Sequence, residues 1–122
     1  MYSCHVVAGK NFGDEGKGQL TAELTRRLLQ AGRCPLVIRH NGGAQAGHTV
    51  EDKKNRFIFH QLGSGTWHGA DTYFSESFLP DFLKIGDEIN AYAKERKCSP
   101  DSVRVYVNGS CRAVTVYDVL LN

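Results

Sequence analysis

A glycine-rich loop between an apolar run and an amphipathic helix constrains the fold of this chain more than any other feature. Residues 9–18 read GKNFGDEGKG and contain four glycines. The apolar run at 3–8 predicts a buried strand before the loop, and Leu20, Leu24 and Leu28 predict a helix that ends near Gly32. A strand, a glycine-rich turn and a helix in this order are typical of an α/β protein that binds phosphate.

A second glycine-rich loop also follows a predicted strand. Residues 36–38 are apolar and predict the strand, and the small and polar residues NGGAQAGH follow at 41–48. In parallel sheets, ligands bind beyond the carboxyl ends of the strands. We therefore expect an α/β fold with a mainly parallel sheet, flanking helices and both loops at one edge of the sheet.

Local patterns predict the remaining elements. Short apolar runs indicate strands at 57–59 and 103–107, whereas the Gly-, Ser- and Thr-rich stretch 60–76 predicts a long functional or irregular loop. Pro80 suits the first turn of a second helix. The apolar face of that helix would carry Phe82, Ile85, Ile89 and Tyr92.

Composition excludes several classes of protein. The chain of 122 residues has a net charge of only +2, too balanced for a dedicated nucleic-acid binder, and no apolar run long enough for a membrane span. The four cysteines show no CxxC spacing, and no charged segment precedes a long apolar stretch at the N-terminus. We expect a single cytoplasmic domain over residues 1–122, with reduced thiols and with neither nucleic acid nor membrane as a partner.

The first loop has the groups that a phosphate site needs. Backbone N–H groups at a helix start and the charge of Lys17 favour an anion. The loop is not a Walker A motif, because Asn11 and Gly18 stand where that motif has glycine and Ser or Thr. Asp14 and Glu15 would repel a phosphate unless one of them binds Mg²⁺ or takes a proton, and Asp14 is the better metal candidate. The alternative is a structural turn whose acids favour the helix dipole.

In the second loop, His48 is a candidate general acid or hydrogen-bond donor to a developing negative charge. The alternative is a structural loop with an incidental histidine. The other histidines have no HxxxH spacing and indicate no zinc pair; we interpret His40, His60 and His68 as structural residues at strand ends or in loops.

Taken together, the two loops resemble those of the adenylosuccinate synthetase family, whose pattern is GxQWGDEGKGK, then RYxGGxNAGHT, then HxxPSG. This chain has GKNFGDEGKGQ at 9–19, RHNGGAQAGHT at 39–49 and HQLGSG at 60–65. The order and the spacing agree over essentially the whole chain, which matches only the N-terminal portion of the family. The resemblance implies a P-loop-like, NTPase-type architecture that is truncated relative to the family.

The resemblance also implies a reaction, the GTP- and Mg²⁺-dependent condensation of IMP with L-aspartate. Asp14 would be the catalytic base and a Mg²⁺ ligand together with the Gly47 carbonyl, and His48 would support phosphoryl transfer. The implied GTP contacts are Gly13, Asp14, Glu15, Gly16, Lys17, Gly18, Gln19, Gly47, His48 and Thr49. The implied IMP contacts are Asp14, Lys17, Gln45, Ala46, Gly47 and His48.

Departures from the family pattern leave alternatives open. Gln45 replaces an asparagine that contacts the nucleotide in the family, which leaves the purine substrate open. The segment GSGTWHGADTY at 63–73 resembles a divergent branch, so a phage-type enzyme that aminates deoxyguanylate is a second reading, although Asp14 is retained. The family's aspartate loop and guanine-reading segment lie beyond Asn122, so we expect incomplete activity from these residues alone. A non-catalytic nucleotide-binding or interaction module is a third reading. Uncovered apolar surface predicts self-association, and the family pattern implies a homodimer.

Overall fold

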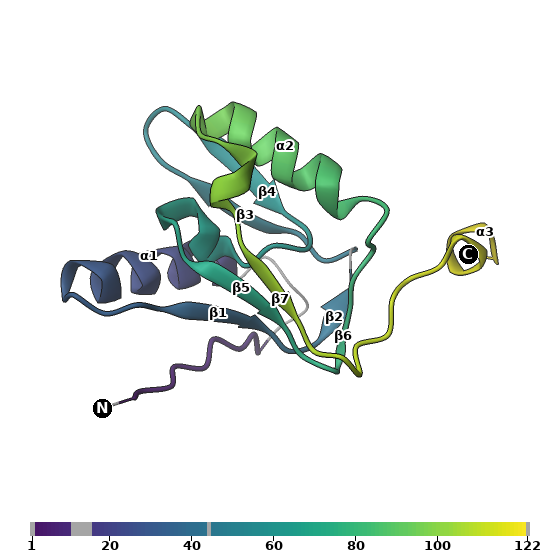
Figure 1. The fold of residues 1–122 in the computed structure, drawn as a ribbon. Helices are drawn as coiled ribbons and strands as arrows, with labels where there is room; N and C mark the ends of the chain where they lie inside the picture. The colour runs from purple at the N-terminus through teal and green to yellow at the C-terminus, as the bar shows by residue number, and fades with distance from the viewer. Residues whose placement is uncertain (1, 11–15, 44, 122) are drawn as a thin grey trace.

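The described chain, residues 2–10, 16–43 and 45–121 of a computed structural model, forms a mixed α/β structure (Figure 1). Its elements, in chain order, are α1 (Lys17–Gln30), β1 (Leu36–Arg39), β2 (Gly42–Gly43), β3 (His48–Glu51), β4 (Arg56–Phe59), the 3₁₀ helix η1 (Ser64–His68), β5 (Asp71–Phe74), β6 (Phe78–Leu79), α2 (Ile85–Arg96), the 3₁₀ helix η2 (Pro100–Ser102), β7 (Val105–Val107) and α3 (Val116–Leu121).

Three parallel strands in the order β1-β5-β7 form the larger sheet. An antiparallel hairpin of β3 and β4 stands apart from it, with α1 and α2 packed against its strands (Figure 1). Strands β2 and β6 make a short parallel pair. The predicted α/β class, with a parallel sheet and flanking helices, is therefore confirmed.

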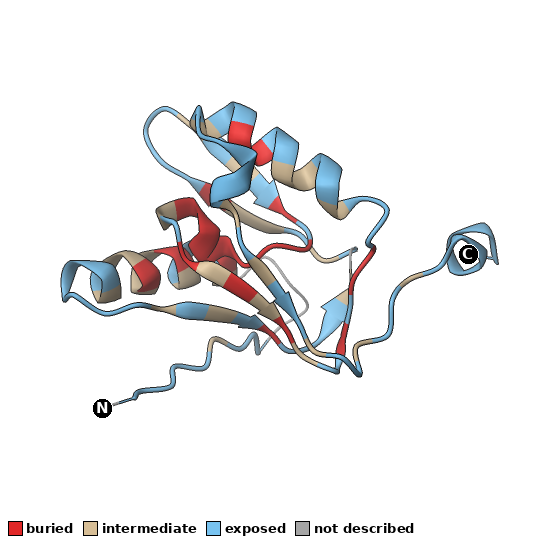
Figure 2. Cartoon of the chain, in the orientation of Figure 1, coloured by how far each residue is buried: buried red, intermediate tan, exposed pale blue. Residues whose placement is uncertain are grey.

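The main core lies between the hairpin, η1 and the two long helices. Phe59 and Leu62 are fully buried, and Trp67 and Tyr92 are almost so (Figure 2). The Phe59 ring centroid lies 4.9 Å from that of Phe57 and 5.7 Å from that of Tyr92. The Tyr92 hydroxyl donates to the Thr66 carbonyl at 2.6 Å, so the buried phenol is satisfied.

The prediction of a loop at 60–76 is wrong. Residues 61–67 are all buried, and the stretch contains η1 and β5. A Cβ atom on Gly63 or on Gly65 would come within 2.5 Å of the Val37 side chain, so these glycines serve close packing against β1. Buried polar side chains of the stretch have hydrogen-bond partners; for example, Thr72 Oγ1 accepts from the Gly63 N–H at 3.0 Å, and Gln61 Oε1 accepts from the Asp81 N–H at 2.8 Å.

The predicted strand at 3–8 is also wrong. These residues adopt no strand, and Val6 is 84% exposed. Figure 1 shows the N-terminal segment running outside the sheet. An apolar run becomes a strand only where a neighbouring strand pairs with it, and within the described residues none does so.

Pro80 does not occupy the first turn of the second helix. Helix α2 begins only at Ile85, because a turn over 81–84 separates Pro80 from it. The N–H of Ile85 donates to the Asp81 carbonyl at 3.1 Å. Pro80 itself is buried, and Phe82 is 46% exposed, so Phe82 lies outside the core face of the helix. Ile89 and Tyr92 do contribute to the core as expected.

One face of the parallel sheet carries apolar side chains that the described residues leave exposed. Val37 faces η1, so Leu36 and Ile38 alternate to the other face, where register places Ile38 beside Tyr73 and Tyr73 beside Tyr106. Ile38 is 56% exposed. The expectation of uncovered apolar surface is confirmed. The four cysteines are free, and no helix among the described residues is long and apolar enough to cross a membrane.

Candidate functional site

The first turn of α1 lies directly against the start of β3. A Cβ atom on Gly18 would lie 2.9 Å from His48 Cβ and 2.9 Å from the Thr49 carbonyl oxygen. Only a residue without a side chain allows this approach. The contact brings Gly18, the last residue of the first glycine-rich loop, beside His48 of the second, and the Ser or Thr of a Walker A motif would not fit at this position.

Gln19 fixes this contact through its side chain. Its Nε2 donates to the Glu51 carbonyl at 3.2 Å, and its Oε1 accepts from the Glu51 N–H at 3.0 Å. The carboxamide thus pairs with the main chain of β3 as a neighbouring strand would. Because its carboxamide is already bonded to Glu51, Gln19 could contact a phosphate only through its main-chain N–H.

The start of α1 has the geometry of an anion-binding helix end. Gly16 adopts a left-handed conformation with φ 75°, and the helix ladder opens with the Leu20 N–H donating to the Gly16 carbonyl at 2.9 Å. The N–H groups of the first turn carry the positive end of the helix dipole. Lys17 adds a full charge next to them. The predicted site residues Gly13, Asp14 and Glu15 lie outside the described residues.

His48 is held from one side by a buried arginine. Arg39, the last residue of β1, is 6% exposed, and its Nη1 lies 2.8 Å from Nδ1 of His48. Its Nη2 donates to the His60 carbonyl at 3.3 Å. The guanidinium carbon lies 4.8 Å from the centroid of the Phe78 ring, a cation–π geometry.

His48 is neutral at physiological pH in this setting. Burial lowers its pKa to about 4 from an ordinary 6.5, and the positive charges of Arg39 and Lys17 and the neighbouring His60 act in the same direction. A neutral imidazole beside a helix N-terminus can donate one hydrogen bond without adding charge.

We expect His48 to titrate with a midpoint near pH 4 in ¹⁵N-edited NMR spectra of the folded chain. The unfolded state binds a proton at this side chain as the pH falls through 6.5, whereas the folded state binds it only near pH 4. The free energy of unfolding therefore decreases as the pH is lowered from 6.5 to about 4. In His48→Gln this part of the pH dependence should disappear. A midpoint near 6.5 in the wild type would contradict the assignment.

The second loop connects to α2 through His60. Its Nδ1 lies 3.0 Å from the Ala46 carbonyl oxygen, and its main-chain N–H donates to Glu88 Oε1 at 2.7 Å. Glu88 also accepts from the Gln61 N–H at 2.9 Å, and burial raises the pKa of this carboxyl. An open groove of about 610 Å³ between β4 and α2 is lined by Phe57, Ile58, His60, Gln61, Lys84, Asp87, Glu88 and Ala91.

The predicted residues of the second loop are distributed around His48. Thr49 follows it in β3, Gly47 precedes it with an exposed backbone, and Gln45 is exposed. Ala46 donates its N–H to the Gly43 carbonyl at 3.1 Å. Among the described residues, no three His, Cys, Asp or Glu side chains form a group that could hold a metal.

Sequence reasoning missed Arg39 and Glu88 as parts of the site. A signal for Arg39 was present, because an arginine continues the apolar run 36–38 at the edge where the second loop begins. Glu88 had no such signal, since it stands among other charged and polar residues of α2.

Comparisons with known proteins place the chain beside one family. The sequence profile described as "Adenylosuccinate synthetase" matches residues 6–122. An adenylosuccinate synthetase from Picrophilus torridus is 34% identical over 110 residues, which are 90% of this chain and 24% of the relative. One from Syntrophomonas wolfei is 41% identical over 93 residues, which are 75% of this chain and 20% of the relative.

A solved structure agrees in fold. The fully ligated adenylosuccinate synthetase from Plasmodium falciparum superposes with a TM-score of 0.68 at 23% identity, over 87% of this chain and 23% of that one. The likeness confirms the expected P-loop-like architecture. The chain spans about a quarter of the length of these relatives.

Proposed function

This chain belongs to the adenylosuccinate synthetase family, and from that membership we propose that it supplies the phosphate-facing part of a GTP-dependent ligase that joins IMP to L-aspartate. The proposal rests above all on the contact at Gly18, where the positive end of α1 meets His48. Phosphoryl transfer needs positive charge and a hydrogen-bond donor at the same place, and these two elements supply both.

In the proposed reaction, Asp14 removes the proton from N1 of IMP, and the 6-oxygen then attacks the γ-phosphorus of GTP. A new phosphorus–oxygen bond forms, and the bond to the leaving GDP breaks. The amine of aspartate then displaces the phosphate at the purine carbon. Lys17 and the first-turn N–H groups would bind the phosphates, while neutral His48 would donate a hydrogen bond to the reacting oxygens.

Mg²⁺ suits the donors that the family implies in this chain. A carboxylate from Asp14 and the Gly47 carbonyl are hard oxygen donors, the kind that Mg²⁺ prefers, and the metal would neutralise phosphate charge when bound. The Gly47 backbone is exposed and directly precedes His48, which contacts the helix end that would bind the phosphates.

Calorimetric titration of the folded 122-residue chain with GTP and Mg²⁺, with and without IMP, tests the proposal. We expect saturable binding that needs Mg²⁺ and becomes tighter with IMP. Lys17→Ala should weaken binding about tenfold or more, because it removes a charge from the phosphates. Absence of heat with a sample that is folded by circular dichroism would overturn the proposal.

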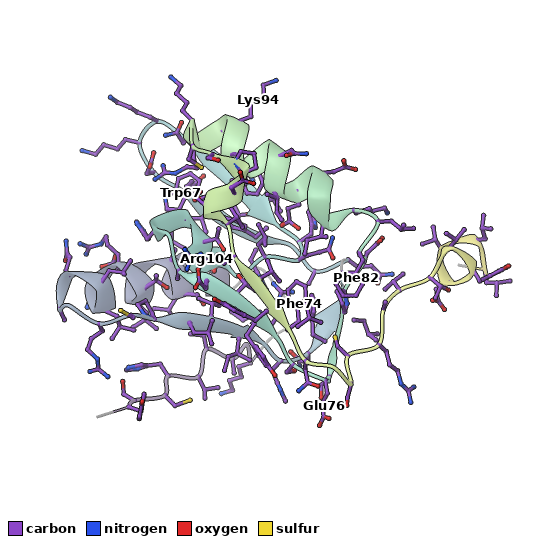
Figure 3. The ribbon with its side chains drawn as sticks, viewed as in Figure 1. Trp67, Phe74, Glu76, Phe82, Lys94 and Arg104 are labelled. Carbon is purple, nitrogen blue, oxygen red and sulfur yellow. The ribbon has the colours of Figure 1, made fainter. Side chains whose placement is uncertain are left out.

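Lys94→Ala is the matched control for that variant. Lys94 points outward from the exposed side of α2 (Figure 3), so its removal should leave binding unchanged. An equal loss in both lysine variants would mean that overall charge, and not a site at α1, attracts the nucleotide. Sedimentation of the same sample tests the expected self-association.

The same titration separates the alternatives that Gln45 leaves open. Enhancement by deoxyguanylate in place of IMP would favour the phage-type reaction. Tight Mg²⁺–GTP binding that neither purine monophosphate changes would favour a nucleotide-binding module without catalysis.

A further inference from the structure

Arg39 is a buried charged side chain at the candidate site that three partners hold in place. Its guanidinium contacts His48 at 2.8 Å, the His60 carbonyl at 3.3 Å and the face of Phe78 at 4.8 Å. Three separate partners therefore fix its plane. At 6% exposure, it has little room for another orientation.

The chemistry of this contact decides which nitrogen of His48 carries the proton. A guanidinium has only donors, so Nδ1 of His48 must accept and cannot itself hold a proton. A neutral imidazole has one N–H, which is then on Nε2. We propose that Arg39 is a positioning residue that fixes the Nε2–H tautomer of His48 and so makes this histidine a hydrogen-bond donor.

A carboxylate at the same position would do the opposite. It would accept from Nδ1–H and leave Nε2 as an acceptor, which is the arrangement of a general base. With arginine there, His48 has no lone pair at Nε2 with which to remove a proton. This inference deepens the proposed function and rests on it for the role of the donated hydrogen; it leaves Asp14 as the base.

Lysine is a poor substitute for arginine at this position. The planar fork of Arg39 contacts an imidazole nitrogen and a carbonyl with two different nitrogens, while the flat face stacks on a ring. A lysine ammonium is a single point charge on a shorter side chain and cannot make all three contacts. The arrangement therefore requires the guanidinium shape as well as its charge.

NMR spectra of the ¹⁵N-labelled full chain at neutral pH, without nucleotide, test the inference. We expect a protonated Nε2 and an accepting Nδ1 on His48, with a scalar coupling between Nδ1 and the Arg39 guanidinium nitrogen. In Arg39→Met the coupling should vanish, the Nδ1 resonance should move towards that of an unbonded nitrogen, and a measurable Nδ1–H population should appear.

Arg96→Met is the matched control. Arg96 stacks on Trp67 at 4.1 Å and is also partly buried, so the variant removes a similar side chain without touching His48. The His48 resonances should not change there. If Arg39→Met fails to fold, the wild-type spectrum still decides the question, because a proton on Nδ1 of His48 there would contradict the inference.

A proton on Nδ1 in the wild type, or an unchanged His48 in a folded Arg39→Met chain, would overturn the inference. Because no nucleotide is present, this outcome is separate from that of the proposed function. The expected tautomer in a chain that binds no Mg²⁺–GTP would refute the function and leave the positioning contact intact.

Discussion

Replacing Phe59 by alanine is expected to lower the free energy of unfolding by about 3–5 kcal/mol. The ring is fully buried, packs edge-on against Phe57 at 4.9 Å and lies 5.7 Å from the ring of Tyr92. Alanine would remove those contacts and leave a cavity between the hairpin and α2. The loss is a large part of the total stability of a domain of this size, and chemical denaturation measures it.

Phe82→Ala is the control for this prediction. The Phe82 ring is 46% exposed in the turn before α2, so the same substitution should cost less than about 1 kcal/mol. Equal losses at the two positions would mean that the hairpin is not the centre of the core. Phe59 also pairs with His48 across β3 and β4, so its loss should disturb the His48 resonances as well.

Gly18→Ala is expected to lower the free energy of unfolding by about 1–3 kcal/mol and to abolish measurable binding of Mg²⁺–GTP. The new Cβ would lie 2.9 Å from the Thr49 carbonyl oxygen, and main chain cannot move aside as a flexible side chain can. Helix α1 would have to shift away from β3, which separates the helix start from His48. Denaturation and calorimetry on one sample measure both effects.

Gly86→Ala controls for the intrinsic effect of alanine in a helix. Gly86 lies in α2, and a Cβ atom added there would meet nothing within 4 Å, so alanine should raise the free energy of unfolding by up to about 1 kcal/mol. The two substitutions should therefore differ in sign. A stabilising effect at Gly18 would show that α1 does not press on β3 as described.

The sequence predicted those elements whose pattern is local. Leucines spaced along 20–28 indicated helix α1, and the apolar runs at 36–38 and 57–59 indicated β1 and β4. The same reasoning failed at 60–76. Its glycines resemble those of a loop, but their lack of a side chain is what allows η1 to pack between α1 and β1. No local sequence pattern indicates that contact.

The residues of the candidate site also fall into two groups, those identified from the sequence and those found only in the structure. Lys17 and His48 were identified from the sequence because a glycine-rich turn at a helix start and a histidine among small residues have recognisable chemistry. The role of Arg39 and the contacts of Glu88 were not, since each depends on a partner at least 9 residues away in the chain. The tautomer of His48 in particular follows from one distance between two strands.

By itself, the sequence determined the family, the α/β class, the helix that follows the first glycine-rich loop and the chemical types of group in the candidate site. Only the tertiary structure decided that the 3–8 run is not a strand, that 61–67 is buried, and that α1 and β3 meet at Gly18. The physical reason is the separation along the chain between the residues that determine each feature. Helix periodicity and motif chemistry are written in neighbouring residues, whereas strand pairing, burial of polar side chains and the ionisation of His48 depend on groups that folding brings together.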